Sequence, residues 1–564
     1  MKKQFITVGD RQLHIRRGGS GPPVILLHPS PQSSLFSLPM AEKLEKNFTV
    51  IAVDTPGYGL SDPLPGNPKE RNLEDYIQSF IMMLDVLGFE KAAFYGNATG
   101  AEIAHILAAK RPDRVAICML DTAGHVLDEE VDKITDGYFP DVKPCRDGAH
   151  LLRHWDMVRS LYVHSPWQFT ADDARLRIDM PAPDYLHDKV LDYLRAGEGY
   201  VHAYKPAFYT AKHKLISRVS VPATLTRWEG KPDLTEVDDL IDAGLPENFS
   251  VLNAGPSMDE RLAVSEQYLL TNYLSSGKIA GRPAPQIDPN SNRLQKIFVD
   301  VRGGQVLAQV CLTGTGRPLL ALHSASGSSE ELLEYLRPFV GFRPVIAIDN
   351  PSNGESDHLL EGLDISIEYY ANYALNVLDS LQINEADVIG LWMGGQVAIE
   401  MATLYPSRIK HIVMVGAQLY SNTEVKDLVE NYTPSIAPQW DGGHLVRAWA
   451  MVRDMSLYWP WYKRTSNSVF NGNNKLDPYF IDSRVIDLLK VGDLYQKIHR
   501  CSFAYPTGAK LAALTIPSLV MDHVRSPIYD KMALTSLIAP NCILCDIPES
   551  MDLLPTILEE FFGT

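Results

Sequence analysis

The stretch that decides the fold is Gly96-Asn97-Ala98-Thr99-Gly100, which returns as Gly390-Leu391-Trp392-Met393-Gly394. Each copy follows a short apolar run typical of a buried strand and precedes a stretch with helical spacing. A Gly-x-X-x-Gly turn between a strand and a helix normally lifts a nucleophilic side chain above a parallel sheet. Here position X is Ala98, which has no functional group, or Trp392, whose indole has one N–H donor and no nucleophilic atom. The pattern therefore predicts the backbone of a catalytic turn without its usual chemistry.

Sequence blocks around this turn recur in the same order, with an offset of about 294 residues. The best-matched pair is DGAHLLRHWDMVR (147–159) and DGGHLVRAWAMVR (441–453), identical at nine of thirteen positions. A repeat this long indicates a duplicated domain. We expect domain 1 over 1–274, a linker rich in Ser, Gly, Pro and Asn over 275–295, and domain 2 over 296–564.

Short β-branched apolar runs such as 24–27 and 49–53 alternate with amphipathic stretches such as 73–87. This alternation predicts the α/β class, with a mostly parallel, doubly wound sheet in each domain. The stretches of about 125–217 and 418–511 lack the strand rhythm. Each is predicted to be a helical cap inserted over the carboxyl edge of its sheet, where open α/β folds bind ligands.

Composition excludes several classes of partner. The formal net charge of −17 argues against nucleic acid and anionic membranes, which both require a basic face. Six cysteines in 564 residues form no disulfide framework, and the first residues lack the apolar segment of a signal peptide. A cytoplasmic protein is therefore expected. We expect no cofactor and no metal, because the sequence has neither a phosphate-binding glycine loop nor a metal-ligand motif.

Three further motifs accompany the turn in both halves. They are a His after a strand (His28, His323), an Asp-x-Pro-x-x-Gly-x-Ser-Asp loop (54–62, 349–357) and a Pro-x-Arg before the next strand. Together they resemble the α/β-hydrolase superfamily over nearly the whole chain. The cap motif and the Trp459–Tyr462 segment look like a bacterial group within it. The resemblance implies two tandem α/β-hydrolase domains.

The same resemblance implies a Ser-His-Asp triad, and the sequence departs from it. The family's general base is a His on the loop after the last strand, but NAGPSMDER (253–261) and CDIPESMDLL (545–554) contain none. Without nucleophile and base the acyl-enzyme route is lost, so we expect a degenerate triad in both copies. The implied oxyanion donors are backbone N–H groups, of Ser30 and Thr99 in the first half, and these tolerate side-chain loss.

The cap repeat is the second place where chemistry is expected. On a helix, His150 and Arg153 share one face, and Arg can hold a carboxylate bidentately. The alternative reading is structural, with helix packing and Arg capping of carbonyls. The candidate catalytic residues are His150, Arg153, Ser30 and Thr99. The candidate substrate-binding residues are His28, Ala98, Asp121, Trp155, Tyr200, His202 and Tyr204. A second site, degenerate and filled by its Trp, comprises His323, Trp392, His444 and Arg447.

The expected function is a cofactor-independent enzyme acting on a small oxygenated compound, aromatic or carboxylated, in the domain 1 pocket. Hydrolytic, C–C cleaving, lyase and isomerase chemistry all remain open. One alternative is a non-catalytic small-molecule receptor or a scaffold for an active hydrolase. Another is a hydrolase with a relocated nucleophile such as Ser257 or Thr99. The expected partner is a small molecule, and the two halves are expected to pack as an intramolecular pseudo-dimer.

Overall fold

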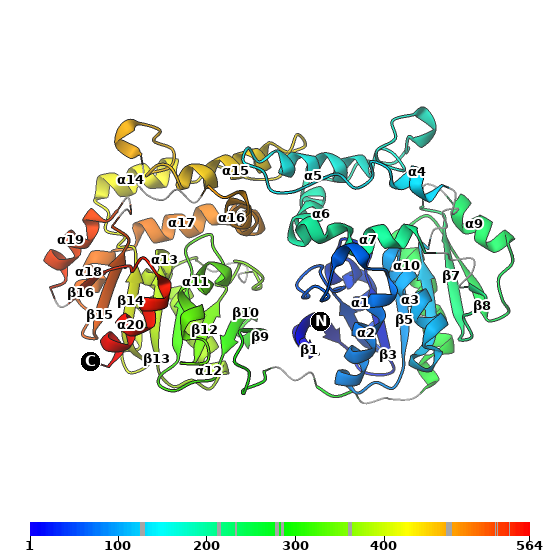
Figure 1. The fold of residues 1–564 in the computed structure, drawn as a ribbon, viewed down its shortest axis with the longest axis horizontal. Coiled ribbons are helices and arrows are strands. Elements are labelled where there is room, and N and C mark those ends of the chain that lie inside the picture. Colours follow the sequence, from blue (N-terminus) through cyan, green and yellow to red (C-terminus); the bar gives the residue numbers. More distant parts are fainter. Residues whose placement is uncertain are drawn as a thin grey trace. The chain divides into compact units, whose positions relative to one another are not determined.

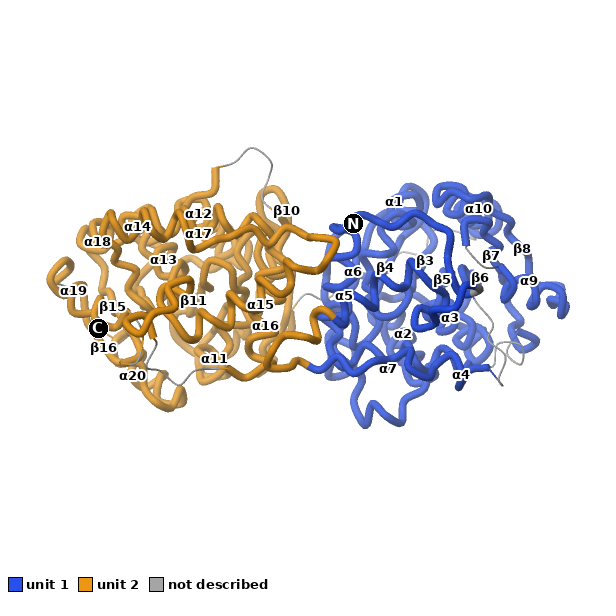
Figure 2. The backbone as a smooth tube through the Cα atoms, turned by 90° about the horizontal axis from the view of Figure 1, so that it is seen from above, with its two compact units in different colours: residues 1–143, 153–286 blue, residues 144–152, 287–564 orange. Residues whose placement is uncertain are grey.

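The computed structural model describes the chain except for residues 124–129, 211–215, 232–233, 277–280, 284–286, 359–363, 470–475, 525, 527, 541 and 564. Parts of the predicted linker and of both predicted caps thus lie outside the described residues. The chain forms two compact units (Figure 2). Unit 1 comprises residues 1–143 and 153–286, and unit 2 comprises residues 144–152 and 287–564.

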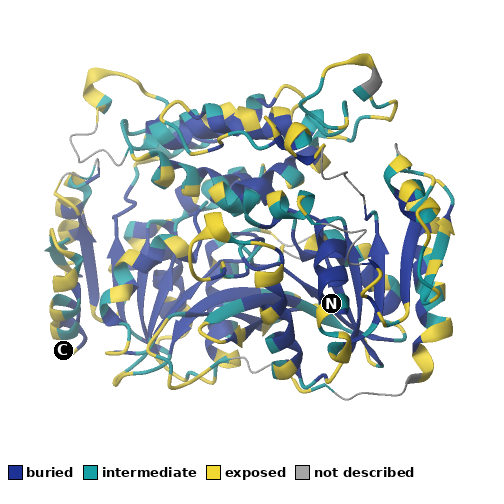
Figure 3. Ribbon diagram, turned by 45° about the vertical axis from the view of Figure 1, so that its right-hand side comes forward, coloured by how far each residue is buried: buried dark blue, intermediate teal, exposed yellow. Residues whose placement is uncertain are grey.

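Unit 1 is built on an eight-stranded sheet in the order β1-β2-β4-β3-β5-β6-β7-β8. The strands are β1 (Lys2–Val8), β2 (Arg11–Gly18), β3 (Pro23–Leu27), β4 (Thr49–Val53), β5 (Ala92–Asn97), β6 (Val115–Asp121), β7 (Ala223–Trp228) and β8 (Phe249–Ala254). β2 pairs antiparallel with β1 and β4, and the remaining pairs are parallel. The central strands β3, β4 and β5 are buried along their whole length, as their continuous apolar runs predict. Figure 3 shows most of the strands in the dark blue of buried residues.

Helices cover both faces of this sheet (Figure 1). One apolar core joins the strands to α2 (Glu74–Leu87), α3 (Thr99–Lys110) and α9 (Thr235–Asp242). The other joins them to α1 (Leu38–Leu44) and α10 (Met258–Asn272). The cap region contains α4 (Val131–Thr135), α5 (Ala149–Ser160), α6 (Pro183–Ala196) and α7 (Val201–Phe208). The first turn of α5 belongs to unit 2 and the rest of this helix to unit 1.

Unit 2 repeats the same strand order as β9-β10-β12-β11-β13-β14-β15-β16. Its strands are β9 (Gln295–Val301), β10 (Gly304–Cys311), β11 (Leu319–Leu322), β12 (Val345–Ile348), β13 (Ala386–Leu391), β14 (Ile409–Val415), β15 (Ser518–Asp522) and β16 (Cys542–Asp546). Its helices are α11 (Leu333–Leu336), α12 (Ile367–Ser380), α13 (Met393–Leu404), α14 (Asn422–Asn431), α15 (Gly443–Met455), α16 (Pro478–Val491), α17 (Leu494–Ala504), α18 (Thr507–Ala512), α19 (Asp530–Ile538) and α20 (Leu554–Phe562). The predicted fold class is confirmed, and two sheets of equal order fit a tandem duplication.

Among the described residues, no helix combines the length and the apolar character that crossing a bilayer requires. In the same residues, no three His, Cys, Asp or Glu side chains gather closely enough to hold a metal ion.

Candidate functional site

Both elbows keep a strained backbone. Ala98 has φ 48° and ψ −115°, and Trp392 has φ 51° and ψ −109°. Non-glycine residues rarely adopt positive φ, and such conformations typically mark sites that the surrounding structure enforces. The flanking glycines explain the enforcement. A side chain on Gly96 would collide with the carbonyl of Gly100, and a side chain on Gly100 would collide with that of Leu27. The elbow therefore packs directly against the end of β3.

The His that follows β3 has both ring nitrogens occupied by backbone groups. His28 Nδ1 lies 2.9 Å from the carbonyl oxygen of Pro29, and His28 Nε2 accepts from the N–H of Thr55 at 2.9 Å. This pattern fixes the neutral Nδ1–H tautomer, and burial lowers the pKa of His28 further. His323 makes the equivalent bonds in unit 2, to Ser324 and from Asn350. Each His thus joins two loops at the carboxyl edge of its sheet.

The predicted oxyanion donors of unit 1 are buried and unengaged. Ser30 is 8% exposed and Thr99 is 5% exposed. Thr99 begins α3, where a helix leaves its first N–H groups without an internal partner. In the part of the chain that the structure describes, the backbone N–H of neither residue donates to another protein group. Two donors beside an elbow are what stabilisation of a developing negative charge requires.

The elbow residue of unit 2 lies among aromatic rings. The Trp392 ring lies 5.7 Å from that of Trp459, which in turn contacts Tyr420 and Tyr432. Trp392 also packs against the apolar core of unit 2. Ala98 has only a methyl group at the corresponding position. The two elbows therefore share a backbone and differ in the space that their side chains occupy.

Tyr58 links the site loop of unit 1 to its cap, and sequence reasoning missed it. The buried hydroxyl donates to the carbonyl of Tyr200 at 2.8 Å and accepts the N–H groups of Ala203 and Tyr204 at 3.1 Å each. Burial raises the pKa of Tyr58, so the hydroxyl keeps its proton. Asn353 stands at this position in unit 2 and donates to the carbonyls of Ala325 and Gly327, in the loop that follows β11. The available signal in the sequence was that the motif of residues 54–62 has Tyr58 where its copy, residues 349–357, has Asn353.

The Asp that follows β4 in unit 1 and β12 in unit 2 has its pKa shifted in opposite directions in the two units. Asp54 accepts from the N–H groups of Ser34 and Leu60 and lies 2.8 Å from His14 Nδ1. Burial alone would raise its pKa, but His14 and these N–H groups hold the pKa of Asp54 well below its usual range. In unit 2, Leu307 occupies the position of His14, and burial raises the pKa of Asp349 to about 6.

A cap carboxylate faces the same loops and was also missed. Asp192 of α6 is 7% exposed, and burial raises its pKa to about 6 despite the nearby cations Arg195 and Lys189. Its counterpart Asp487 of α16 accepts a hydrogen bond from Ser328 at 2.8 Å, and burial likewise raises its pKa to about 6. Each unit therefore has a buried acid on a cap helix, α6 in unit 1 and α16 in unit 2.

Asp121 forms a buried polar triad instead of facing an open pocket. Its carboxylate accepts from Tyr95 and from Arg261, whose Nη2 lies 2.8 Å away. The Arg261 guanidinium also lies over the ring of Trp228, 4.6 Å from its centroid. Arg261 comes from the stretch where the family resemblance implies the catalytic His. At the three equivalent positions unit 2 has the buried apolar residues Ile389, Val415 and Leu554.

The candidate His and Arg side chains of the cap block have hydrogen-bond partners in both copies. His150 lies in unit 2, where its Nδ1 accepts the N–H of Cys145 at 3.3 Å and its Nε2 lies 2.8 Å from Asp482 of α16. His444 accepts the N–H of Gln439 in the same way. Arg153 is exposed and lies 3.5 Å from the carbonyl oxygen of Asp141.

The remaining cap candidates are distributed over several environments. Arg447 donates to the carbonyl of Ser435, as Arg153 does to that of Asp141, and Trp155 is buried. Tyr200 donates to the carbonyl of Pro140 at 2.9 Å. Tyr204 pairs its hydroxyl with that of Tyr138 at 2.8 Å, and His202 lines a separate pocket. The candidates thus do not converge on one point.

Ser257, the alternative nucleophile, is engaged as a helix cap. Its hydroxyl donates to the carboxylate of Glu260 at 2.6 Å and accepts the N–H of the same residue at 3.2 Å. This reciprocal pairing is a capping box at the start of α10.

Comparison with known proteins identifies related sequences in both halves. A family model described as "alpha/beta hydrolase fold" matches residues 22–143 and 317–447. A serine hydrolase-like protein of Danio rerio is 32% identical over 139 residues, which cover 24% of this chain and 42% of that protein. A fluoroacetate dehalogenase of Burkholderia sp. is 32% identical over 136 residues, covering 23% of this chain and 45% of the dehalogenase.

A third relative is the 2-(acetamidomethylene)succinate hydrolase of Mesorhizobium japonicum, 32% identical over 130 residues, covering 23% of this chain and 46% of the hydrolase. The chain thus spans less than half the length of each of these curated relatives. The residues that the family model matches contain the elbows, the His loops and the central strands described above. Residues 22–143 and 317–447 are therefore similar in sequence to the α/β-hydrolase family.

Proposed function

We propose that unit 1 is an enzyme that works without a covalent intermediate, and that the Ser-His-Asp triad is degenerate in both units. It binds a small oxygenated compound above Ala98 and stabilises an oxyanion or enolate at the N–H groups of Ser30 and Thr99. The reaction class is hydrolysis by direct water attack, C–C cleavage, elimination or isomerisation. Each of these passes through negative charge on an oxygen.

The observation that carries this proposal is the combination of a strained elbow with two unengaged donors. A non-glycine residue in such a conformation costs of the order of 1–3 kcal/mol. The close packing of α3 against β3 enforces this strain and keeps the Thr99 N–H at the elbow. A side chain no larger than methyl leaves room for a ligand beside these donors.

The substrate class draws support from the names of two relatives. Fluoroacetate and 2-(acetamidomethylene)succinate are both small carboxylated compounds. We extend this class to unit 1. Tyr204 lies on α7, which is tied to the site loop through Tyr58, but its hydroxyl is paired with that of Tyr138 within the cap. His150 and Arg153 receive a structural role in this proposal, since their polar atoms are engaged within the cap.

The alternative functions predict different experimental results. A receptor or scaffold would bind a small carboxylate without converting it. A hydrolase with a relocated nucleophile would form a covalent adduct at Thr99 or Ser257. The capping box at Ser257 argues against the second position, because its hydroxyl proton is directed at Glu260.

The test uses the second elbow as a template for the first. Ala98→Trp places in unit 1 the residue that unit 2 carries at nearly the same φ and ψ. It fills the proposed binding space without demanding a new backbone. The measured reaction is hydrogen–deuterium exchange at the methyl group of pyruvate, followed by NMR, together with conversion of fluoroacetate and 2-(acetamidomethylene)succinate, followed by mass spectrometry.

Wild-type protein is expected to accelerate at least one of these reactions, and Ala98→Trp to reduce the rate at least tenfold. Trp392→Ala, which alters only unit 2, serves as the control and should leave the rate unchanged. Equal rates for wild type and Ala98→Trp would refute the site. Binding without conversion would favour the receptor, and an adduct in the intact mass would favour a relocated nucleophile.

A further inference from the structure

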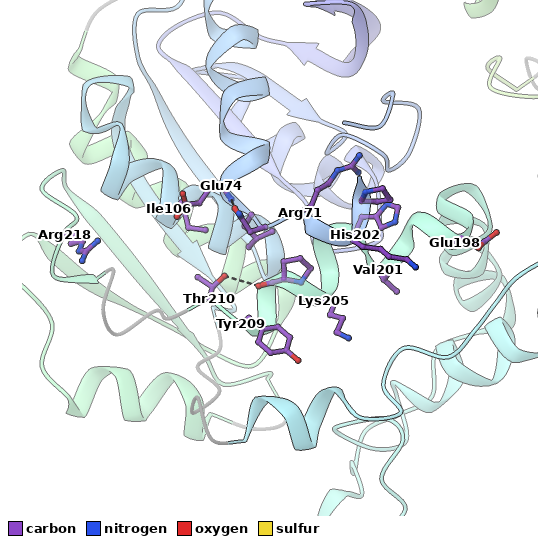
Figure 4. A pocket seen from close by; sticks show the side chains of 15 residues that line it. Arg71, Glu74, Ile106, Glu198, Val201, His202, Lys205, Tyr209, Thr210 and Arg218 are labelled. Atoms are coloured by element: carbon purple, nitrogen blue, oxygen red, sulfur yellow. Dashed lines mark hydrogen bonds between the residues drawn. The ribbon is translucent and has the colours of Figure 1, made fainter. Parts of the chain in front are cut away.

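Unit 1 contains a pocket of about 1100 Å³ that is separate from the elbow (Figure 4). Its lining comes from the segment before α2, from the side of α3 at Ile106, from α7 and from Arg218. A volume of this size suits a small organic molecule. None of Ser30, Ala98 and Thr99 contributes to the lining.

The lining is rich in cations. Lys69, Arg71, Lys205 and Arg218 contribute positive charges, and His202 lies near Arg71. This local concentration of positive charge contrasts with the net charge of −17 for the whole chain. Figure 4 shows Arg218 at one end of the pocket and Arg71 with His202 toward the other. The separation suits a ligand with negative groups at two ends.

The two acids of the lining already have basic partners outside it. Glu74 pairs with Lys110, and Glu198 lies 3.7 Å from Lys143. By contrast, none of the four cations forms an ion pair with a carboxylate in the described part of the chain. Arg71 donates to the carbonyls of Leu64 and Gly66, and its Nε is buried without a hydrogen-bond partner. The pocket thus has a surplus of positive charge.

The second copy repeats this surplus only in part. The alignment of RNLEDY (71–76) with ISIEYY (365–370) places Ile365 at the position of Arg71. In the same way Ala513 stands at the position of Arg218, whereas Arg500 stands at that of Lys205. Two of the cations are therefore replaced by uncharged residues. A duplicated fold does not require these charges, which favours a ligand as their reason.

We propose that this pocket binds a small organic dianion whose carboxylate or phosphate groups flank an apolar body. Arg71 and Lys205 hold one charged group and Arg218 holds the other, while Leu73, Ile106 and Val201 contact the body between them. Arg contributes bidentate hydrogen bonds to either kind of group. The proposal is independent of the chemistry at the elbow.

Binding is measured by isothermal titration calorimetry on the full chain. The probes are terephthalate, pyrophosphate, benzoate and the neutral dimethyl ester of terephthalate. Terephthalate is expected to bind at least tenfold more tightly than benzoate, and the diester to show no binding. Comparison of terephthalate with pyrophosphate separates a carboxylate ligand with an apolar body from a phosphate ligand, because pyrophosphate has no apolar body.

Lys205→Gln and Arg218→Gln each remove one charge at an exposed position and should weaken terephthalate binding about tenfold. Lys46→Gln, an exposed residue elsewhere in unit 1, is the matched control and should leave binding unchanged. The proposal is overturned if no dianion binds, if the diester binds equally well, or if the two pocket variants match wild type.

Discussion

The buried triad of Tyr95, Asp121 and Arg261 makes a quantitative prediction, because the chain also contains its apolar replacement. Asp121→Val removes the carboxylate and leaves the Arg261 guanidinium buried at 4% exposure without its counter-charge. The triple variant Tyr95→Ile, Asp121→Val and Arg261→Leu instead copies the three residues that unit 2 has at these positions. It removes every polar member of the triad together.

The expected free-energy changes differ in size. Breaking a buried ion pair by removing one partner costs about 3–5 kcal/mol, since the remaining charge has lost its compensation. Replacing the whole buried pair by apolar residues of similar volume is often neutral or stabilising. Some cavity cost arises around Tyr95→Ile, so we expect the triple variant to lie within about 2 kcal/mol of wild type. The single variant should therefore be less stable than the triple variant.

The assay must resolve unit 1, because a two-unit chain need not unfold in one transition. Urea unfolding followed by hydrogen exchange and mass spectrometry reports on peptides of β5 and β6 separately from unit 2. Asp121→Asn, which keeps the shape of the side chain, serves as the control for loss of charge. If the triple variant is as unstable as Asp121→Val, the triad owes its stability to packing and the electrostatic reasoning is wrong.

Three further predictions concern the elbow, the cap acid and the link to the cap. Ala98→Gly should stabilise unit 1 by about 1 kcal/mol, since glycine relieves the positive φ. Ala109→Gly within α3 is the control and should destabilise unit 1 by about 1 kcal/mol. If urea unfolding shows that both variants change the free energy of unfolding in the same direction, this reasoning is wrong. Because burial raises the native pKa of Asp192 to about 6, its contribution is fully present below pH 4 and declines as the pH rises through 6. Asp192→Asn should therefore gain up to about 3 kcal/mol over wild type at pH 8 and little at pH 4, measured by urea unfolding at both values. Tyr58→Phe leaves two N–H groups and a carbonyl of the cap unpaired, so it should cost about 1–3 kcal/mol and speed hydrogen exchange in α7 while leaving unit 2 unchanged.

The sequence was sufficient for the fold because the deciding contacts are local. Gly96 and Gly100 are four residues apart, and their close approach is encoded in a five-residue motif that occurs twice. The continuous apolar runs of β3 and β4 likewise follow from burial on both faces of a parallel sheet. Such features depend on neighbouring residues, so periodicity and spacing predict them.

The side-chain contacts of the site were beyond sequence reasoning because they join distant segments. Asp121 meets Arg261 across 140 residues, and His150 meets Asp482 across 332. Helical spacing places His150 and Arg153 on one face but does not determine what that face contacts. The cap block is the stretch in which the two copies agree best, whereas the informative positions are those where the copies differ, such as Tyr58 and Asn353.

At the two elbows, the backbone conformation at position X is kept while the side chain at X differs. The flanking glycines are fixed by collisions that any side chain would cause, so the backbone at position X is inherited whatever the residue does. The side chain at X points away from those collisions and has diverged to the extremes of size, from Ala98 to Trp392, without moving φ by more than a few degrees. A fold that holds one position rigid while leaving its side chain unconstrained lets a duplicated copy lose or gain chemistry there through a single substitution.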